Sequence, residues 1–236
     1  MTKYKFLLFD LDGTLTDSEE GIINCVRYGL QSCGFNVPEY KTLRAFIGPP
    51  LVESYQNLCG LSYEDTQRAV LKYRERYSEK GIFENKVYDG IPKLLYDLKN
   101  AGYRLALATS KPEIFAKRIL SHFGIADAFD AAAGSSIERE DETKADMIHL
   151  AMKRLGLKEE DKAEVLMIGD RRHDILGAKE CGVSVLGVQY GYAPKGELSE
   201  YGADIIAESV SELRAILLDE KDIEVKIEEN NDAEID

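Results

Sequence analysis

The stretch KFLLFDLDGTLTDS (residues 5–18) decides how the rest of the sequence is interpreted. Its apolar run FLLF (residues 6–9) is typical of a buried strand, and Asp10, Asp12 and Asp17 follow it within a few residues. Carboxylates that lie close together repel one another, and burying each one costs several kcal/mol unless a positive charge compensates. The sequence therefore predicts that something positive lies beside the end of this strand.

Short apolar runs recur along the chain, and the segments between most of them have helical periodicity. The runs cover residues 5–10, 104–109, 129–134, 164–170 and 183–188. They are almost continuously apolar, which is typical of a parallel sheet covered on both faces. Segments 90–102, 111–124 and 144–156 carry apolar residues at helical spacing and end in glycine. This alternation predicts right-handed crossovers and a doubly wound α/β sheet.

One interval breaks the alternation, because more than ninety residues separate the first run from the second. Residues 19–33 have a helical pattern, and no strand pattern of similar quality occurs in the interval. Within it, one face of a predicted helix carries Tyr63, Thr66, Val70, Tyr73 and Tyr77. We therefore expect an all-helical cap domain at residues 16–86, inserted into a core made of residues 1–15 and 87–218.

The end of the chain differs in composition, because residues 219–236 contain nine acids and two lysines. So few apolar residues predict a disordered acidic tail, with a docking peptide as the alternative. The whole chain has a net charge of −13. That charge argues against binding to nucleic acid, which needs a basic stripe.

The remaining bulk properties indicate a cytoplasmic protein. No apolar stretch approaches the roughly 20 residues that a membrane span needs. The N-terminus, MTKYKFLLFD, is too short and too soon charged to be a signal peptide. The four cysteines lack metal-ligand spacing, and three of them have apolar or small neighbours and are expected to pack as reduced thiols. We expect a monomer or homodimer with no membrane or nucleic-acid partner.

Polar residues follow four of the apolar runs, where each predicted strand ends. They are Asp10 and Asp12 after the first run, Thr109 and Ser110 after the second, Lys144 at the start of the helix after the third, and Asp170 with Asp174 after the fourth. Taken alone, each has a plain alternative, such as a turn, a helix cap, a solvated lysine or a pair between Asp174 and Arg171. Ligands of open α/β sheets bind outside the carboxyl ends of the strands. The joint arrangement therefore favours a catalytic site.

A divalent cation and a phosphate would together explain these charges. Mg²⁺ takes oxygen ligands, commonly one or two carboxylates together with waters and phosphate oxygens. Lys144 supplies a second, fixed positive charge. The two cations would hold several carboxylates ionised and still admit a dianionic phosphate.

These residues resemble the four motifs of the haloacid dehalogenase superfamily. The resemblance is carried by DLDGT (residues 10–14), Thr109, Lys144 and GDRRHD (residues 169–174), and it extends to about residue 217. With its second aspartate, the motif DLDGT resembles the corresponding motif of the phosphohydrolases of that superfamily. The insertion resembles the helical cap of phosphoglycolate phosphatase and β-phosphoglucomutase relatives. The resemblance implies a Rossmann-like core.

The resemblance also implies a two-step phosphoryl transfer. Asp10 would attack phosphorus and form an aspartyl phosphate. Asp12 would protonate the leaving group and then take a proton from the hydrolytic water. Mg²⁺ would be held by the Asp10 carboxylate, the Asp12 carbonyl and Asp170, with Asp174 bound directly or through water.

Further residues are implied for the phosphate and for the leaving group. Thr109, Ser110 and Lys144 would bind the transferring phosphoryl group, and Gly13 would let the backbone approach it closely. The segment FIGPPL (residues 46–51) resembles the substrate-facing loop of the cap. Arg44 and Phe46 are therefore candidates for substrate selection, although Arg44 could equally be solvated. Arg171 and Arg172 depart from the family pattern, in which a small hydroxyl residue often comes first.

The leading functional hypothesis is a Mg²⁺-dependent phosphatase of a small phosphomonoester, similar to phosphoglycolate. A 5′-nucleotidase is the nearest alternative, because the aromatic residues Phe46, Tyr55, Tyr73 and Tyr77 could stack on a base. A mutase similar to β-phosphoglucomutase is disfavoured, because no basic residue near the predicted loop would grip a second phosphate. A non-catalytic phosphoacceptor signalling domain is disfavoured by Asp12 and by the large insertion.

Overall fold

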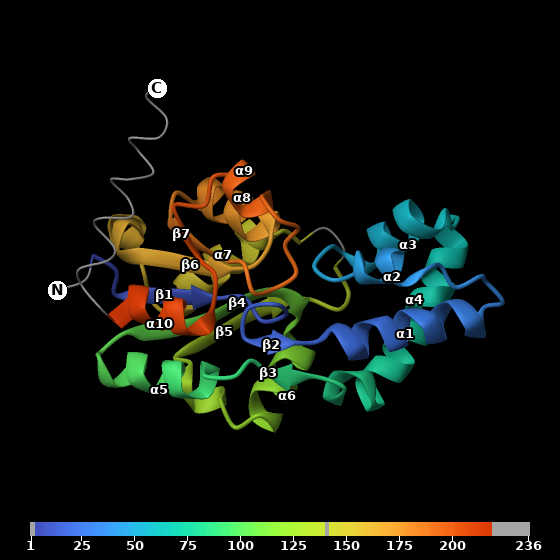
Figure 1. Cartoon of the computed structure of the whole chain (residues 1–236), viewed down its shortest axis with the longest axis horizontal. Coiled ribbons are helices and arrows are strands. Elements are labelled where there is room, and N and C mark those ends of the chain that lie inside the picture. Colours follow the sequence, from blue (N-terminus) through green and yellow to red (C-terminus); the bar gives the residue numbers. More distant parts are fainter. Residues whose placement is uncertain (1–2, 140–141, 219–236) are drawn as a thin grey trace.

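The computed structural model describes residues 3–139 and 142–218, and the acidic tail expected at 219–236 lies outside them. Six parallel strands of the described part form one sheet in the order β5-β4-β1-β6-β7-β8 (Figure 1). The strands are β1 (Phe6–Phe9), β4 (Arg104–Pro112), β5 (Ala131–Ser135), β6 (Val165–Gly169), β7 (Ser184–Val188) and β8 (Ile205–Ala207). The predicted doubly wound α/β sheet is confirmed. Only β8 was not predicted, because three residues are too few to show a pattern.

Helices cover both faces of this sheet. One face carries α5 (Ile91–Asn100), α6 (Glu113–His122) and α10 (Val210–Leu218), and the other carries α7 (Lys144–Arg154) and α8 (Arg172–Cys181). Successive side chains of β1 point to opposite faces of the sheet. Leu7 and Phe9 belong to one buried apolar cluster and Leu8 to the other. The helix expected from residue 111 begins at Glu113, because β4 continues to Pro112.

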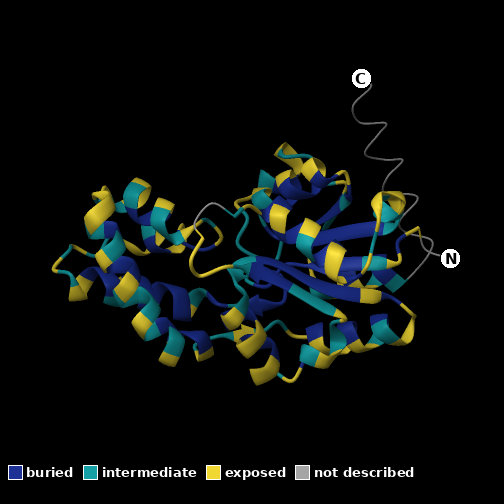
Figure 2. Cartoon of the chain, turned by 180° about the vertical axis from the view of Figure 1, so that it is seen from behind, coloured by how far each residue is buried: buried dark blue, intermediate teal, exposed yellow. Residues whose placement is uncertain are grey.

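The long interval after β1 is helical, and it lies to the right of the sheet in Figure 1. It contains α1 (Glu19–Ser32), α2 (Tyr40–Arg44), α3 (Leu51–Cys59), α4 (Tyr63–Glu79) and the 3-10 helix η1 (Gly81–Phe83). Figure 2 shows buried residues on its inner side and exposed ones outside. Of the face predicted for α4, Thr66, Val70 and Tyr77 are buried. Tyr63, the first residue of the helix, is 63% exposed.

A two-stranded ribbon joins the helical interval to the sheet. It pairs β2 (Thr16–Asp17) with β3 (Lys86–Val87) in antiparallel fashion, at the positions expected for the two crossings. The ribbon was not predicted, because two residues per strand leave no periodicity. The buried residues of the helical interval and of one sheet face form a single cluster. The division into two domains stays a prediction.

Short elements complete the described part. They are the 3-10 helices η2 (Ala126–Ala128) and η3 (Glu159–Glu164) and the single turn α9 (Glu197–Glu200). No helix of the described residues is long and apolar enough to cross a membrane.

Candidate active site

Three acids meet at the carboxyl ends of β1 and β6. These two strands are neighbours, with Phe9 opposite Ile168, so the residues that follow them share one edge of the sheet. Asp10, Asp170 and Asp174 each place one carboxylate oxygen within 4.8 Å of the others. All three side chains are buried. Three buried carboxylates so close together require compensating positive charge.

Lys144 supplies part of that charge. Its Nζ lies 2.8 Å from Oδ1 of Asp10 and 2.8 Å from Oδ1 of Asp174. It also donates a hydrogen bond to the carbonyl of Ala108. Burial alone would lower the pKa of Lys144, but the two carboxylates outweigh it and raise that pKa above its usual value. A capping box at Thr143 starts α7 at Lys144, which places the lysine against the acids.

Of the three acids, Asp170 has the fewest groups that balance its negative charge. Its Oδ2 accepts a 2.7 Å hydrogen bond from the amide of Tyr192, while its buried Oδ1 has no hydrogen-bond partner among the described residues. Burial raises the pKa of this carboxyl well above its usual value, and Asp174 and Asp10 raise it further. Gly13 has φ +84°, and a Cβ there would lie 2.1 Å from Oδ2 of Asp170. The glycine therefore makes room for the Asp170 carboxylate.

Asp174 is held by the first turn of α8. Its Oδ2 accepts a 3.0 Å hydrogen bond from the amide of Arg171. Burial raises the pKa of Asp174 to about 6, although Lys144 acts in the opposite direction. All donor atoms of the cluster are hard oxygens, and Oδ1 of Asp170 lacks a partner. This donor set fits Mg²⁺.

Asp12 has a different partner from the other acids. Its Oδ2 forms an ion pair with Nζ of Lys111, and its buried Oδ1 has no partner among the described residues. The Lys111 ammonium also lies 5.0 Å from the ring centroid of Tyr77, which belongs to α4. The amide of Lys111 donates to Oγ1 of Thr109. Lys111 was not predicted as a site residue, although its place directly after Thr109 and Ser110 could have indicated it.

A cavity of about 560 Å³ opens over these residues. Of the predicted residues, it is lined by Asp10, Asp12, Thr109, Ser110, Lys144, Asp174 and Phe46. Asp170 and Gly13 are buried and do not line it. The helical interval adds an apolar wall, made mainly of Phe46, Pro49, Pro50, Leu51 and Val52. The structure thus brings most of the predicted residues to one cavity.

Arg44 does not line this cavity. Its Nε lies 3.1 Å from Oε2 of Glu19, and half of its side chain is exposed. The lining cation from α4 is Arg74, which forms no ion pair or hydrogen bond with any described residue. Nothing in the sequence distinguishes Arg74 from the other basic residues of α4.

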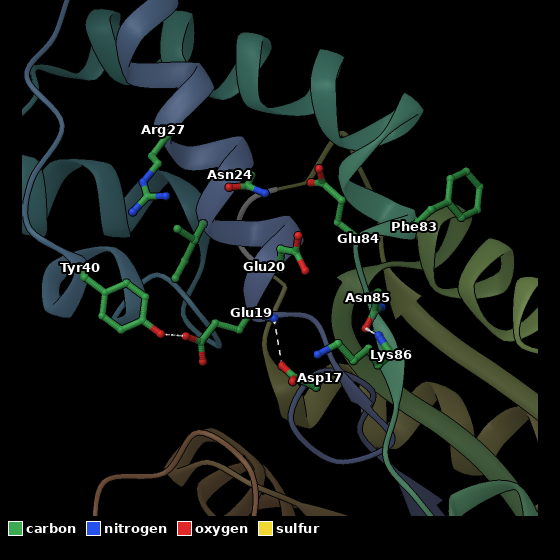
Figure 3. A pocket seen from close by; sticks show the side chains of 11 residues that line it. Asp17, Glu19, Glu20, Asn24, Arg27, Tyr40, Phe83, Glu84, Asn85 and Lys86 are labelled. Carbon is green, nitrogen blue, oxygen red and sulfur yellow. Dashed lines mark hydrogen bonds between the residues drawn. The ribbon is translucent and has the colours of Figure 1, made fainter.

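A second cavity, of about 630 Å³, lies beside the β2–β3 ribbon and shares no lining residue with the first (Figure 3). Its wall includes Glu19, which accepts a hydrogen bond from the hydroxyl of Tyr40 and also pairs with Arg44. None of the predicted catalytic residues reaches it. We assign no chemistry to this cavity.

Comparisons with known proteins identify the family of the chain. A family model described as haloacid dehalogenase-like hydrolase matches residues 7–188. The chain is 40% identical over 215 residues to a 5′-nucleotidase of Pseudomonas aeruginosa, covering 91% of this chain and 96% of that protein. It is 39% identical over 215 residues to the tyrosine-protein kinase PtkA of Mycobacterium tuberculosis, covering 90% of this chain and 72% of that protein.

Two further matches are named for phosphatases. A phosphoglycolate phosphatase of Colwellia psychrerythraea is 31% identical over 217 residues, covering 88% of this chain and 94% of that protein. The solved structure of a predicted phosphatase from Clostridium acetobutylicum has a TM-score of 0.85 and 45% identity, covering 91% of this chain and 98% of that one.

Proposed function

This chain belongs to the haloacid dehalogenase-like hydrolase family and is a phosphoric monoester hydrolase, and from that premise we propose a Mg²⁺-dependent phosphatase of small molecules. The resemblance expected from the sequence motifs is confirmed. That the protein works in the cytoplasm, as a monomer or homodimer, stays a prediction. The observation that carries the proposal is the buried cluster of Asp10, Asp170, Asp174 and Lys144.

The first chemical step is assigned to Asp10 and Asp12. A carboxylate oxygen of Asp10 forms a bond to phosphorus while the bond from phosphorus to the leaving oxygen breaks. Asp12 gives its proton to that oxygen, so the leaving group departs as an alcohol. The unpaired Oδ1 of Asp12 supports this role, because the other oxygen is engaged by Lys111.

The second step returns the enzyme to its starting state. Asp12 takes a proton from a water molecule, the water oxygen bonds to phosphorus, and the bond from Asp10 to phosphorus breaks. Lys144 and Thr109 would bind the phosphoryl oxygens in both steps. The carboxylates of Asp10, Asp170 and Asp174, with the carbonyl of Asp12, would hold Mg²⁺, which neutralises phosphoryl charge when it is bound.

The substrate we propose is a small phosphomonoester with a second negative charge, as in phosphoglycolate. Arg74 supports this choice, because it lines the cavity and its charge is unpaired among the described residues. A carboxylate on the leaving group would pair with that guanidinium. The relative named phosphoglycolate phosphatase points to the same class.

A 5′-nucleotide is the second candidate. The apolar wall, with Phe46, Leu51 and Val52, offers a surface on which a nucleobase could pack. The relative named 5′-nucleotidase supports this alternative. A mutase and a phosphoacceptor domain have no comparable observation in their favour.

Release of inorganic phosphate from a panel of esters tests the proposal. The panel contains phosphoglycolate, 5′-nucleotides, a sugar bisphosphate and p-nitrophenyl phosphate, each with Mg²⁺ and with EDTA. We expect repeated turnover that depends on Mg²⁺. Absence of turnover on every ester, or equal turnover in EDTA, would refute it.

The variant Arg74→Ala separates the two substrate classes. An anion that pairs with Arg74 should lose about tenfold or more in kcat/KM, since hydrogen bonds to charged groups contribute about 1.5–3 kcal/mol. The matched control is Arg44→Ala, whose guanidinium pairs with Glu19 outside the cavity. Loss with phosphoglycolate but not with nucleotides supports the anionic leaving group. Equal effects on all esters would contradict it.

A further inference from the structure

The loop at residues 45–50 joins α2 to α3 and forms part of the cavity wall. Phe46, Gly48, Pro49 and Pro50 line the cavity, and Phe46 is held edge-on against Tyr55 at 5.0 Å. The loop belongs to the helical interval, whereas the acids and Lys144 belong to the strand ends and helices of the core. The position of this loop against the sheet therefore determines the shape of the leaving-group site.

Arg171 connects this loop to the sheet. It directly follows Asp170 in the chain, and its Nη1 donates a 2.5 Å hydrogen bond to the carbonyl of Ile47. Its Nε lies 2.9 Å from Oε1 of Glu197. The two side chains are only 14% and 10% exposed, so water competes little for these contacts. The guanidinium thus bridges two parts of the chain that are far apart in sequence.

Glu197 fixes the direction of that guanidinium. Oε1 of Glu197 also accepts a 3.0 Å hydrogen bond from the amide of Arg172, so the carboxylate is anchored to the start of α8. Asp174, another acid close in sequence, is engaged by Lys144 and by the amide of Arg171. The Arg171 side chain consequently points toward the loop and leaves the acid cluster to Lys144.

Gly48 completes the contact on the side of the loop. Its φ is +106°, and a Cβ added there would lie 2.8 Å from Nη1 of Arg171 and 3.4 Å from its Cγ. Glycine therefore suits this position on two independent grounds, its backbone conformation and the closeness of the guanidinium. The neighbouring Arg172 is exposed, and its guanidinium lies 5.9 Å from the ring of Tyr201.

We propose that Arg171 and Glu197 form a latch that holds loop 45–50 at the carboxyl end of the sheet. Arg171 is then a positioning residue, which acts on the leaving group through Phe46 and the two prolines of the loop. The kinetic part of this inference rests on the proposed phosphatase function. It also gives a role to the arginine that departs from the family motif.

Steady-state kinetics of Arg171→Met test the latch. For p-nitrophenyl phosphate, whose ring we expect to reach the loop, KM should rise about tenfold with little change in kcat, because a buried hydrogen bond to a charged group is lost. For acetyl phosphate, which has a small leaving group, KM should rise less. KM should rise less in Arg171→Lys and in Glu197→Gln than in Arg171→Met, since each of these variants keeps part of the bridge. The matched control Arg172→Met should resemble the original chain.

Hydrogen exchange gives a readout that needs no turnover. Arg171→Met should speed exchange of the amides of residues 45–48, and Arg172→Met should not. This result would support the latch even if no substrate were hydrolysed. Unchanged exchange together with unchanged KM would overturn it. An equal rise in KM for both substrates with an increased Mg²⁺ requirement would also overturn it, because it would place Arg171 at the metal site.

Discussion

At the scale of single residues, Asp170 carries the strongest sign that the acid cluster binds a cation. It combines complete burial, a partnerless Oδ1 among the described atoms and a raised pKa. Asp174 shares the site, with its pKa raised to about 6. In the metal-free chain the folded state therefore binds more protons than the unfolded state between about pH 4 and 6. Its stability from these groups falls as the pH rises through that interval.

Bound Mg²⁺ should reverse this loss of stability at higher pH. Because the ion requires ionised carboxylates, its stabilising effect should grow from pH 5.5 to pH 7.5. Thermal unfolding with and without Mg²⁺ measures this, and taking the difference removes the other titrating groups, such as His173. The variant Asp170→Asn should lose most of the Mg²⁺ response. An equal Mg²⁺ effect at both pH values would contradict the assignment of these acids.

Several of the residues that the sequence predicted share one property, a fixed place at a strand end. Asp10, Thr109 and Asp170 follow apolar runs, so their positions could be inferred from the runs alone. Arg74 could not be assigned in the same way, and Lys111 was not, although it directly follows Thr109 and Ser110. Their roles depend on long side chains that cross between the sheet and the helical interval, and spacing does not encode that direction.

At the scale of elements, the contact between α4 and the end of β4 links the helical interval to the acids. Tyr77 of α4 is buried, stacks on Tyr73 with centroids 5.4 Å apart, and lies under the Lys111 ammonium. Its hydroxyl is buried with no hydrogen-bond partner among the described residues. Ring and hydroxyl therefore have opposite expected effects on stability.

Two substitutions at this position separate those effects. Tyr77→Leu removes the ring and should lower the free energy of unfolding by about 2 kcal/mol, through lost packing and a lost cation–π contact. Tyr77→Phe keeps the ring and removes the unpaired hydroxyl, so stability should stay equal or rise by about 1 kcal/mol. Urea unfolding measures both. A larger loss for Tyr77→Phe than for Tyr77→Leu would show that the hydroxyl has a partner.

The elements that the sequence predicted are the long or strongly apolar ones. The strands around residues 5–10 and 164–170 and the helices around 19–33 and 144–156 were found close to their predicted places. The ribbon of β2 and β3 and the short β8 were missed. Two or three residues have no periodicity, and such strands form because tertiary contacts place their backbones side by side.

At the scale of the whole molecule, the helical interval and one sheet face share a buried cluster. It contains Phe9 of β1, Leu11 and Leu15 of the segment that follows, and Ile22 and Val26 of α1. A shared core couples the unfolding of its parts. We therefore expect one calorimetric transition, with calorimetric and van't Hoff enthalpies that agree. Two separate transitions would instead show that the interval unfolds as an independent domain.

The central claim is that Asp10 carries the phosphoryl group and Asp12 the proton. The most direct measurement is acid-quenched mass spectrometry after exposure to acetyl phosphate and Mg²⁺. Asp12→Ala keeps the nucleophile but loses acid–base help of about 10²–10⁴-fold. An activated substrate needs little protonation of its leaving group, so this variant should accumulate phosphate on Asp10. Asp10→Asn should carry none. Label on Asp12, or a phosphorylated Asp10→Asn chain, would contradict the account.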